Sequence, residues 1–309
     1  EGVIDKVSPI TRVNYRAGSM INQPNNNNGD NYSGMAASAD ATVIALGLTI
    51  VMEGEENEAI GSSNKGDNIT MQLPENQMQY LRKMRGSHNK PLIVVVFAGC
   101  PLDLTEVSKL ADAVIYAWYP GEQGGNAIAD IIFGDVSPSG KLPITFPKNK
   151  EQLPAYEDYS MKGRTYKYMT QEPLYPFGYG LTYSKLNITD LSVDVENVQE
   201  SKPQIVEATL VNKGNHTIED VIQLYVSLKN SSAGVPLASL KDFKRIRLEP
   251  KQSLKVSFVV APDVYNYIDT NGNVKRHKGD AEIIIGNASP GVRSEVLGAS
   301  LRSITVNVK

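Results

Sequence analysis

The chain has 309 residues, of which 41% are hydrophobic and 21% charged, and its formal net charge is −3. Such a composition is typical of a globular protein with a buried core, and the length is sufficient for two domains. The sequence contains no basic stripe and no apolar run of membrane-spanning length, so we expect neither nucleic acid nor a membrane as a partner. The single cysteine, Cys100, excludes an internal disulfide framework.

The first part of the chain alternates between apolar strands and helices. Continuous apolar runs of strand length occur at 42–48, 91–97 and 113–118. Helical patterns are expected to follow them at 74–84, 103–110 and 124–133. A further short strand is expected at 12–16. Because the strands are apolar on both faces, they predict a parallel sheet covered by helices, with the carboxyl ends of the strands at one edge.

After about residue 183 the apolar residues recur with a period of two. This alternation runs through 186–195, 205–212, 221–228, 253–260, 281–285 and 303–308. Turn signals such as T-N-G-N at 270–273 separate the segments. So many short strands without a helical pattern predict an antiparallel β-sandwich.

The most distinctive segment is Y-P-G-E-Q-G-G-N-A-I-A-D at 119–130, between the strand at 113–118 and a helix. Its glycines allow the backbone to approach neighbouring elements closely, and Gly134 is suited to end the helix. A glycine-rich turn before a helix also suits an anion. Because the segment has neither a lysine nor the G-x-G-x-x-G spacing, close packing is the favoured interpretation.

Together with F-G-D-V-S-P-S-G-K-L-P-I-T-F-P (133–147), G-R-T-Y-K-Y (163–168) and P-L-Y-P-F-G-Y-G-L-T-Y (173–183), this segment resembles the C-terminal half of glycoside hydrolase family 3, the β-glucosidases and β-xylosidases. These motifs are long and occur in the family's order. The resemblance covers both the α/β part and the start of the β part.

The resemblance implies three regions. The first is a parallel-sheet α/β sandwich domain at 1–140, whose first strand and helix we expect to be missing from this chain. A packed interdomain linker follows at 141–183. The last region, 184–309, is expected to be a fibronectin type III-like β-sandwich.

An acidic segment, M-E-G-E-E-N-E at 52–58, follows the first buried strand. Composition alone favours a solvated acidic loop here. Many members of the family carry E-x-E-G-x-D-R, in which the second glutamate is the acid/base catalyst, and the resemblance places this role on Glu55, with Glu53 as the alternative. Because E-N-E-A stands where G-x-D-R would be, the choice among Glu53, Glu55 and Glu56 stays open.

Retaining glycoside hydrolysis also needs a nucleophilic carboxylate. In the family this is an aspartate on a preceding (β/α)₈ barrel, in an S-D-W-like context that this sequence does not contain. Asp103 and Asp112 are not expected to replace it, because the first resembles a helix start and the second precedes a buried strand. The expected partners are therefore a barrel, in the same or another chain, and a β-linked oligosaccharide or glycoside.

The expected function is the C-terminal portion of a retaining β-glucosidase or β-xylosidase, inactive as this chain alone. The alternative is a non-catalytic carbohydrate-binding or interaction module. No substrate-binding residue is assigned, and no cofactor is expected.

His88, His216 and His277 are far apart and lack metal-ligand spacing, so no metal site is expected either. A periplasmic or secreted location is slightly favoured.

Overall fold

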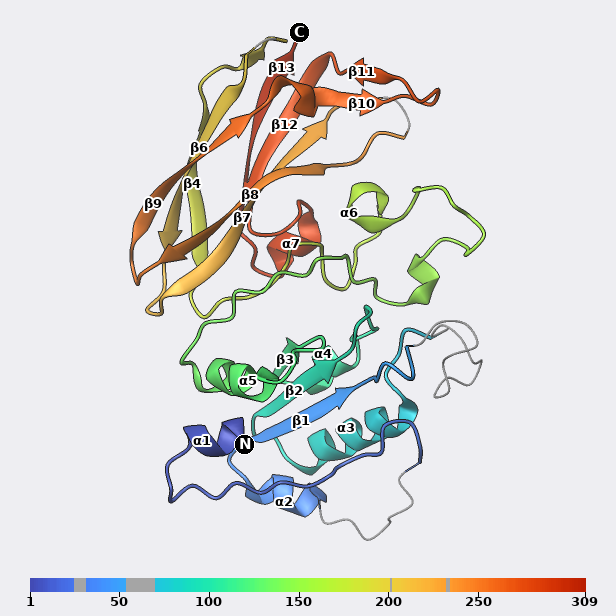
Figure 1. Cartoon of the computed structure of the whole chain (residues 1–309), viewed down its shortest axis with the longest axis vertical. Helices are drawn as coiled ribbons and strands as arrows, with labels where there is room; N and C mark the ends of the chain where they lie inside the picture. Colours follow the sequence, from blue (N-terminus) through green and yellow to red (C-terminus); the bar gives the residue numbers. More distant parts are fainter. Residues whose placement is uncertain (25–31, 54–69, 201, 232–233) are drawn as a thin grey trace. The chain divides into compact units, whose positions relative to one another are not determined.

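The computed structural model describes residues 1–309 except 25–31, 54–69, 201 and 232–233 (Figure 1). The chain divides into two compact units. We call them the α/β unit, residues 1–135 with 147–150, and the β unit, residues 136–146 with 151–309. Among the described residues, no helix combines the length and the apolar character needed to cross a membrane.

The α/β unit is built on a three-stranded parallel sheet, formed in the order β1 (Thr42–Gly47), β2 (Leu92–Phe97) and β3 (Ala113–Tyr116). Its helices are α1 (Gly2–Lys6), α2 (Tyr32–Ser38), α3 (Glu75–Ser87), α4 (Val107–Leu110) and α5 (Gly124–Phe133). In Figure 1, α3 lies on the β1 side of the sheet and α5 on the β3 side. The central position of β2 explains its uninterrupted apolar sequence, since Val94, Val95 and Val96 are all buried. The predicted parallel α/β architecture is confirmed.

Two local expectations were wrong. Residues 12–16 form no strand and are exposed, because their short alternation finds no neighbouring strand with which to pair. The helix expected at 103–110 is confined to Val107–Leu110. Its first part is replaced by a turn in which the Asp103 carboxylate accepts a hydrogen bond from the Thr105 N–H at 3.0 Å, a side-chain contact that competes with helix formation.

The β unit is a sandwich of two sheets. One sheet contains β4 (Leu186–Val193), β6 (Gln204–Asn212) and β9 (Ser253–Val260). The other contains, in spatial order, β5 (Asn197–Val198), β13 (Leu301–Val308), β12 (Gly279–Gly286), β7 (Ile218–Leu228) and β8 (Ser239–Leu248). All neighbouring strands are antiparallel except β13 and β5. The predicted antiparallel β-sandwich is therefore confirmed.

Alternating side chains from the two sheets fill a common core. Ile222 and Leu224 of β7, Phe258 of β9 and Ile283 of β12 are almost completely buried in it. Smaller elements complete the unit: the hairpin of β10 (Asn266–Ile268) and β11 (Val274–Arg276), the helices α6 (Thr165–Tyr168) and α7 (Val292–Val296), and the 3₁₀ turn η2 (Pro262–Tyr265). A second 3₁₀ turn, η1 (Lys150–Gln152), lies where the chain re-enters the β unit.

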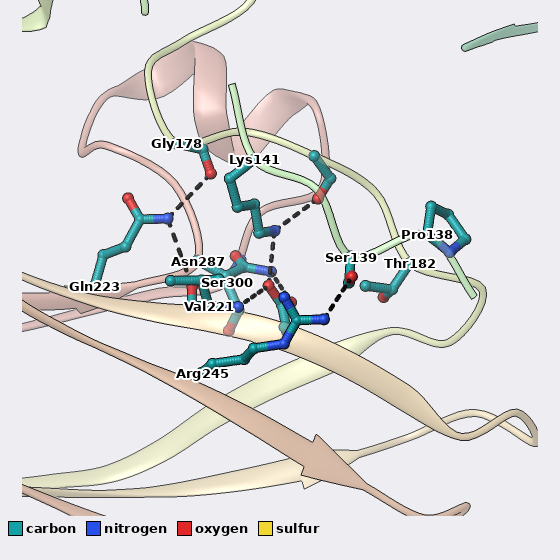
Figure 2. A network of polar contacts seen from close by, with 12 residues as sticks. Pro138, Ser139, Lys141, Gly178, Thr182, Val221, Gln223, Arg245, Asn287 and Ser300 are labelled. Atoms are coloured by element: carbon teal, nitrogen blue, oxygen red, sulfur yellow. Dashed lines mark hydrogen bonds and ion pairs between the residues drawn. The ribbon is translucent and has the colours of Figure 1, made fainter. Parts of the chain in front are cut away.

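A buried polar network fixes segment 136–146 within the β unit (Figure 2). Lys141 donates to the Gly180 carbonyl at 2.8 Å and pairs with Asp220 of β7 at 2.7 Å. The other Asp220 oxygen accepts from the Asn287 amide at 3.0 Å, and Asn287 in turn accepts from the Ser300 N–H at 2.8 Å. The S-G-K-L-P and F-G-Y-G motifs of the sequence therefore meet at one buried charge pair.

Candidate active site

The candidate site lies at the carboxyl edge of the parallel sheet in the α/β unit. Because β1, β2 and β3 run in the same direction, the segments that leave them, beginning at 48, 98 and 117, start from the same edge. Crevices beyond the carboxyl ends of parallel strands are where open α/β sheets bind ligands. The acidic segment predicted from the sequence begins here.

The end of β1 is held by Gln77 of α3. The Gln77 side chain is buried, and its amide group donates to the Gly47 carbonyl at 2.7 Å and accepts from the Gly47 N–H at 2.8 Å. A third hydrogen bond, also 2.7 Å, runs from the same amide to the Ile21 carbonyl. Gly47 itself has no room for a side chain, since an added Cβ would lie 2.0 Å from the Phe97 carbonyl oxygen. The first strand end is therefore fixed by α3 and β2 together.

Glu53 lies at this edge, and both oxygens of its carboxylate accept hydrogen bonds. The Gly99 N–H, just beyond β2, donates to both of them, at 3.1 and 3.0 Å. The Cys100 thiol lies 3.0 Å from Oε1, and the Tyr119 hydroxyl, from beyond β3, donates to Oε2. One side chain from the segment after β1 thus connects to the segments after β2 and β3.

Burial and the Glu53 carboxylate change the acidity of the groups around it. Desolvation, reinforced by the hydrogen bond to Glu53, raises the pKa of the Cys100 thiol to about 12. The pKa of the Tyr119 hydroxyl is raised for the same two reasons, and burial raises that of Tyr116, whose hydroxyl donates to the Cys100 carbonyl. The raised pKa favours the protonated thiol at neutral pH, which argues against a nucleophilic role for Cys100.

The backbone turns sharply after β3. Trp118 has φ +53°, a left-handed conformation that is uncommon for a bulky residue. Its ring packs edge-to-face on Tyr116, with 4.8 Å between centroids. This turn ends β3 at Tyr116, two residues before the predicted limit, and brings Tyr119 to Glu53.

The glycines of the Y-P-G-E-Q-G-G segment serve close packing. Gly121 has φ +73° and its carbonyl accepts from the Gly124 N–H at 3.1 Å, which forms the turn before α5. A Cβ on Gly124 would lie 2.4 Å from the Pro120 ring, and one on Gly2 of α1 would lie 2.5 Å from the Gly125 carbonyl oxygen. Gly134 ends α5 in the left-handed conformation, as its position predicts.

The structure describes only some of the acidic residues considered as catalytic candidates from the sequence. Glu55 and Glu56 lie outside the described residues, whereas Glu53 is at the sheet edge. Asp103 and Asp112 have structural partners: Asp103 holds its turn, and Asp112 accepts from the Leu92 N–H at 2.8 Å and pairs with Arg85 at 2.5 Å.

Within the described part of the chain, no group of histidine, cysteine and acidic side chains is arranged to hold a metal ion. His277, for example, is buried in the β unit and its Nε2 lies 2.9 Å from the Asp280 carbonyl.

Three residues of this edge carry no functional signal in the sequence: Gln77, Gly99 and Tyr119. Gln77 lies in the helix expected at 74–84, and Tyr119 opens the glycine-rich segment at 119–130. Their roles depend on contacts with residues 30, 46 and 66 positions away in the sequence. A local pattern of residues does not predict hydrogen bonds between such distant positions.

Comparison with known proteins identifies the two parts of the chain. Residues 3–183 match the Glycosyl hydrolase family 3 C-terminal domain, and residues 220–289 match the Fibronectin type III-like domain. The chain is 34% identical over 264 residues to a xylan 1,4-beta-xylosidase of Xylanibacter ruminicola, covering 85% of this chain and 29% of that protein. It is 31% identical over 258 residues to a periplasmic beta-glucosidase of Salmonella typhimurium, covering 80% and 33%.

Solved structures show the same relationship. The crystal structure of a mutant beta-glucosidase from Listeria innocua in complex with laminaribiose superimposes with a TM-score of 0.72 at 25% identity, over 90% of this chain and 37% of that one. A β-glucosidase from Erythrobacter marinus gives a TM-score of 0.71 at 29% identity, and the match covers 90% of this chain and 35% of that one. The chain thus spans about a third of the length of the relatives it matches. The chain belongs to glycoside hydrolase family 3, of which it contains the C-terminal α/β domain and the fibronectin type III-like domain.

Proposed function

We propose that this chain is the C-terminal portion of a retaining β-glycosidase, a β-glucosidase or β-xylosidase, and that its α/β unit supplies the acid/base glutamate, Glu55. The observation that best supports the proposal is the position of Glu53 at the carboxyl edge of the parallel sheet, where ligands bind in this class of fold. Glu55 follows two residues later in the chain. The relatives named above include a xylosidase and β-glucosidases, one of them in complex with laminaribiose.

The chemistry divides between two carboxyl groups. Glu55 donates a proton to the glycosidic oxygen as the leaving group departs, and then removes a proton from the water that attacks the glycosyl intermediate. The nucleophile is an aspartate of a (β/α)₈ barrel, in the same or another polypeptide, about 5–5.5 Å from the acid/base. No step requires a cofactor.

Glu53 is the less suitable acid/base candidate. Its two oxygens already accept hydrogen bonds from an N–H, an S–H and an O–H group. To protonate a leaving group, Glu53 would have to exchange these donors for the substrate oxygen. This cost counts against Glu53, and it leaves Glu55, the position that the family motif indicates, as the preferred acid/base.

The test uses the complete enzyme, with its barrel. Glu55→Ala should slow hydrolysis of an unactivated β-linked disaccharide by roughly 10²–10⁴-fold, the usual contribution of general acid catalysis. An activated aryl glycoside needs little protonation in the first step, but the same residue is then missing as the base that activates water, so its glycosyl-enzyme intermediate should accumulate. Added azide should then restore turnover and yield the β-glycosyl azide. Glu56→Ala is the matched control and should change the rates only modestly. Azide rescue in Glu56→Ala and not in Glu55→Ala would assign the role to Glu56.

A non-catalytic carbohydrate-binding module is the competing function. It predicts that binding of β-linked oligosaccharide persists unchanged in Glu55→Ala and that no variant of 53–56 alters turnover. The azide experiment therefore separates the two functions.

A further inference from the structure

The Glu53 carboxylate connects three strand ends that are distant in sequence. Glu53 lies six residues after the end of β1, and its backbone N–H donates to the Thr49 carbonyl at 3.1 Å, closing a turn. Its side chain reaches the segment after β2 at Gly99 and Cys100, and the segment after β3 at Tyr119. A single side chain therefore links the segments that leave all three strands of the sheet.

The partners of Glu53 are hydrogen-bond donors that converge on one acceptor group. Gly99 N–H, Cys100 S–H and Tyr119 O–H are all donors, and hydrogen bonds to an ionised acceptor are stronger than neutral ones. Gly99 must also lack a side chain, since an added Cβ would lie 2.9 Å from the Tyr119 ring and 3.0 Å from Glu53 Oε2. The Glu53 carboxylate thus has specific protein partners on both of its oxygens.

We infer that Glu53 is a positioning residue, whose carboxylate joins the ends of β1, β2 and β3 and so fixes the point at which the chain leaves the sheet edge toward Glu55. The inference rests on the proposed function, in which Glu55 must meet a carboxylate of another domain within a few ångströms. Small displacements of a catalytic group lower the rate strongly, so an anchor two residues away is an effective place to control the geometry.

The first experiment measures the cluster in the 309-residue chain, without any substrate. Cys100 is the only cysteine, so its alkylation by iodoacetamide reports on this site alone. After burial, the Glu53 carboxylate is the next cause of the raised thiol pKa. Glu53→Ala removes it and opens the site, and alkylation at pH 8 should become about tenfold faster. Hydrogen exchange of the Gly99 amide should accelerate in parallel. Glu106→Ala, which removes an exposed glutamate paired with Arg82, is the control and should change neither rate.

The second experiment measures turnover of the complete enzyme. Glu53→Ala should lower kcat for the disaccharide by about 10–100-fold, with no rescue by azide and with the acid and base limbs of the pH profile unmoved. Glu53→Gln keeps an acceptor oxygen for Gly99 and Tyr119, and should restore most of kcat. A purely structural role would instead lower the yield of active enzyme and leave kcat per active site unchanged.

The outcomes separate the inference from the proposed function. Unchanged Cys100 alkylation and Gly99 exchange in Glu53→Ala, or an unchanged kcat per active site, overturns the inference. Azide rescue of Glu53→Ala also overturns it, because Glu53 would then be the acid/base itself. Failure of azide rescue in Glu55→Ala, with the expected response of the Glu53 variants, overturns the assignment of Glu55 and leaves the positioning role of Glu53 supported.

Discussion

Lys141 and Asp220 form a buried ion pair in the β unit, with 2.7 Å between Nζ and Oδ1 and side chains that are 9% and 0% exposed. Lys141 comes from the S-G-K-L-P motif and Asp220 from β7, so the pair attaches segment 136–146 to the sandwich. Each charge has a second partner, the Gly180 carbonyl for Lys141 and the Asn287 amide for Asp220. A buried charge that is satisfied in this way becomes costly when its partner is removed.

We expect Lys141→Ala to destabilise the chain by about 3–5 kcal/mol, because Asp220 is left as an uncompensated buried charge. Thermal or urea unfolding followed by circular dichroism measures the change. Lys229→Ala is the matched control: it breaks the partly exposed pair with Glu282 at 2.5 Å, and should cost no more than about 1 kcal/mol. Adding Asp220→Asn to Lys141→Ala should recover part of the loss. Equal effects of the two lysine variants would contradict this account.

Gln77→Ala should destabilise the α/β unit by about 2–3 kcal/mol. The substitution leaves the Gly47 N–H and carbonyl and the Ile21 carbonyl without the amide that now satisfies them. Gln79→Ala, on the same helix, removes an exposed contact to Glu75 and should change stability by less than about 0.5 kcal/mol. Urea denaturation of the two variants side by side checks the prediction.

The Asp112–Arg85 pair predicts a pH dependence. The hydrogen bond from Arg85, and after it that from the Leu92 N–H, lower the pKa of Asp112 in the folded state below its ordinary value. A carboxyl with a lowered folded pKa contributes stability that is fully present above its unfolded pKa and is lost as the pH falls through the folded pKa. Asp112→Asn should therefore be less stable than the wild type at pH 6, and the difference should shrink toward pH 3. Urea unfolding of both proteins across this range measures it, and a difference that grows on acidification is the contrary result.

We expect the 309-residue chain alone to show no turnover of aryl β-glucosides or β-xylosides. The proposed acid/base can protonate a leaving group, but without a nucleophile no covalent glycosyl intermediate forms. The measurement is release of p-nitrophenol by the purified chain. Turnover that a single substitution in this chain abolishes would show that a second catalytic carboxylate lies within it.

The strands β1 and β2 were predictable because they bury apolar side chains and so leave a continuous apolar pattern in the sequence. The strand β8 was not predicted. It lies at the edge of its sheet, and its exposed face carries Arg245 and Arg247, which pair with Glu219. Charges on an edge strand interrupt the apolar alternation, so the period of two is weaker there. At 12–16 the error is the reverse: the apolar alternation is present, but no strand forms because no neighbouring strand pairs with the segment.

By itself, the sequence determined the fold class, the family and the acidic segment that follows β1, because each depends on local periodicity or on a contiguous motif. The tertiary structure alone decided the environment of Glu53. Gly99 and Tyr119 lie 46 and 66 positions from it in the chain, and they meet it only because three parallel strands end at one edge. The buried partner of Lys141 was undetermined for the same reason, since the sequence of β7 does not reveal which charge will cover Asp220. Contacts of this kind follow from how the strands are ordered in space, which no local pattern of residues encodes.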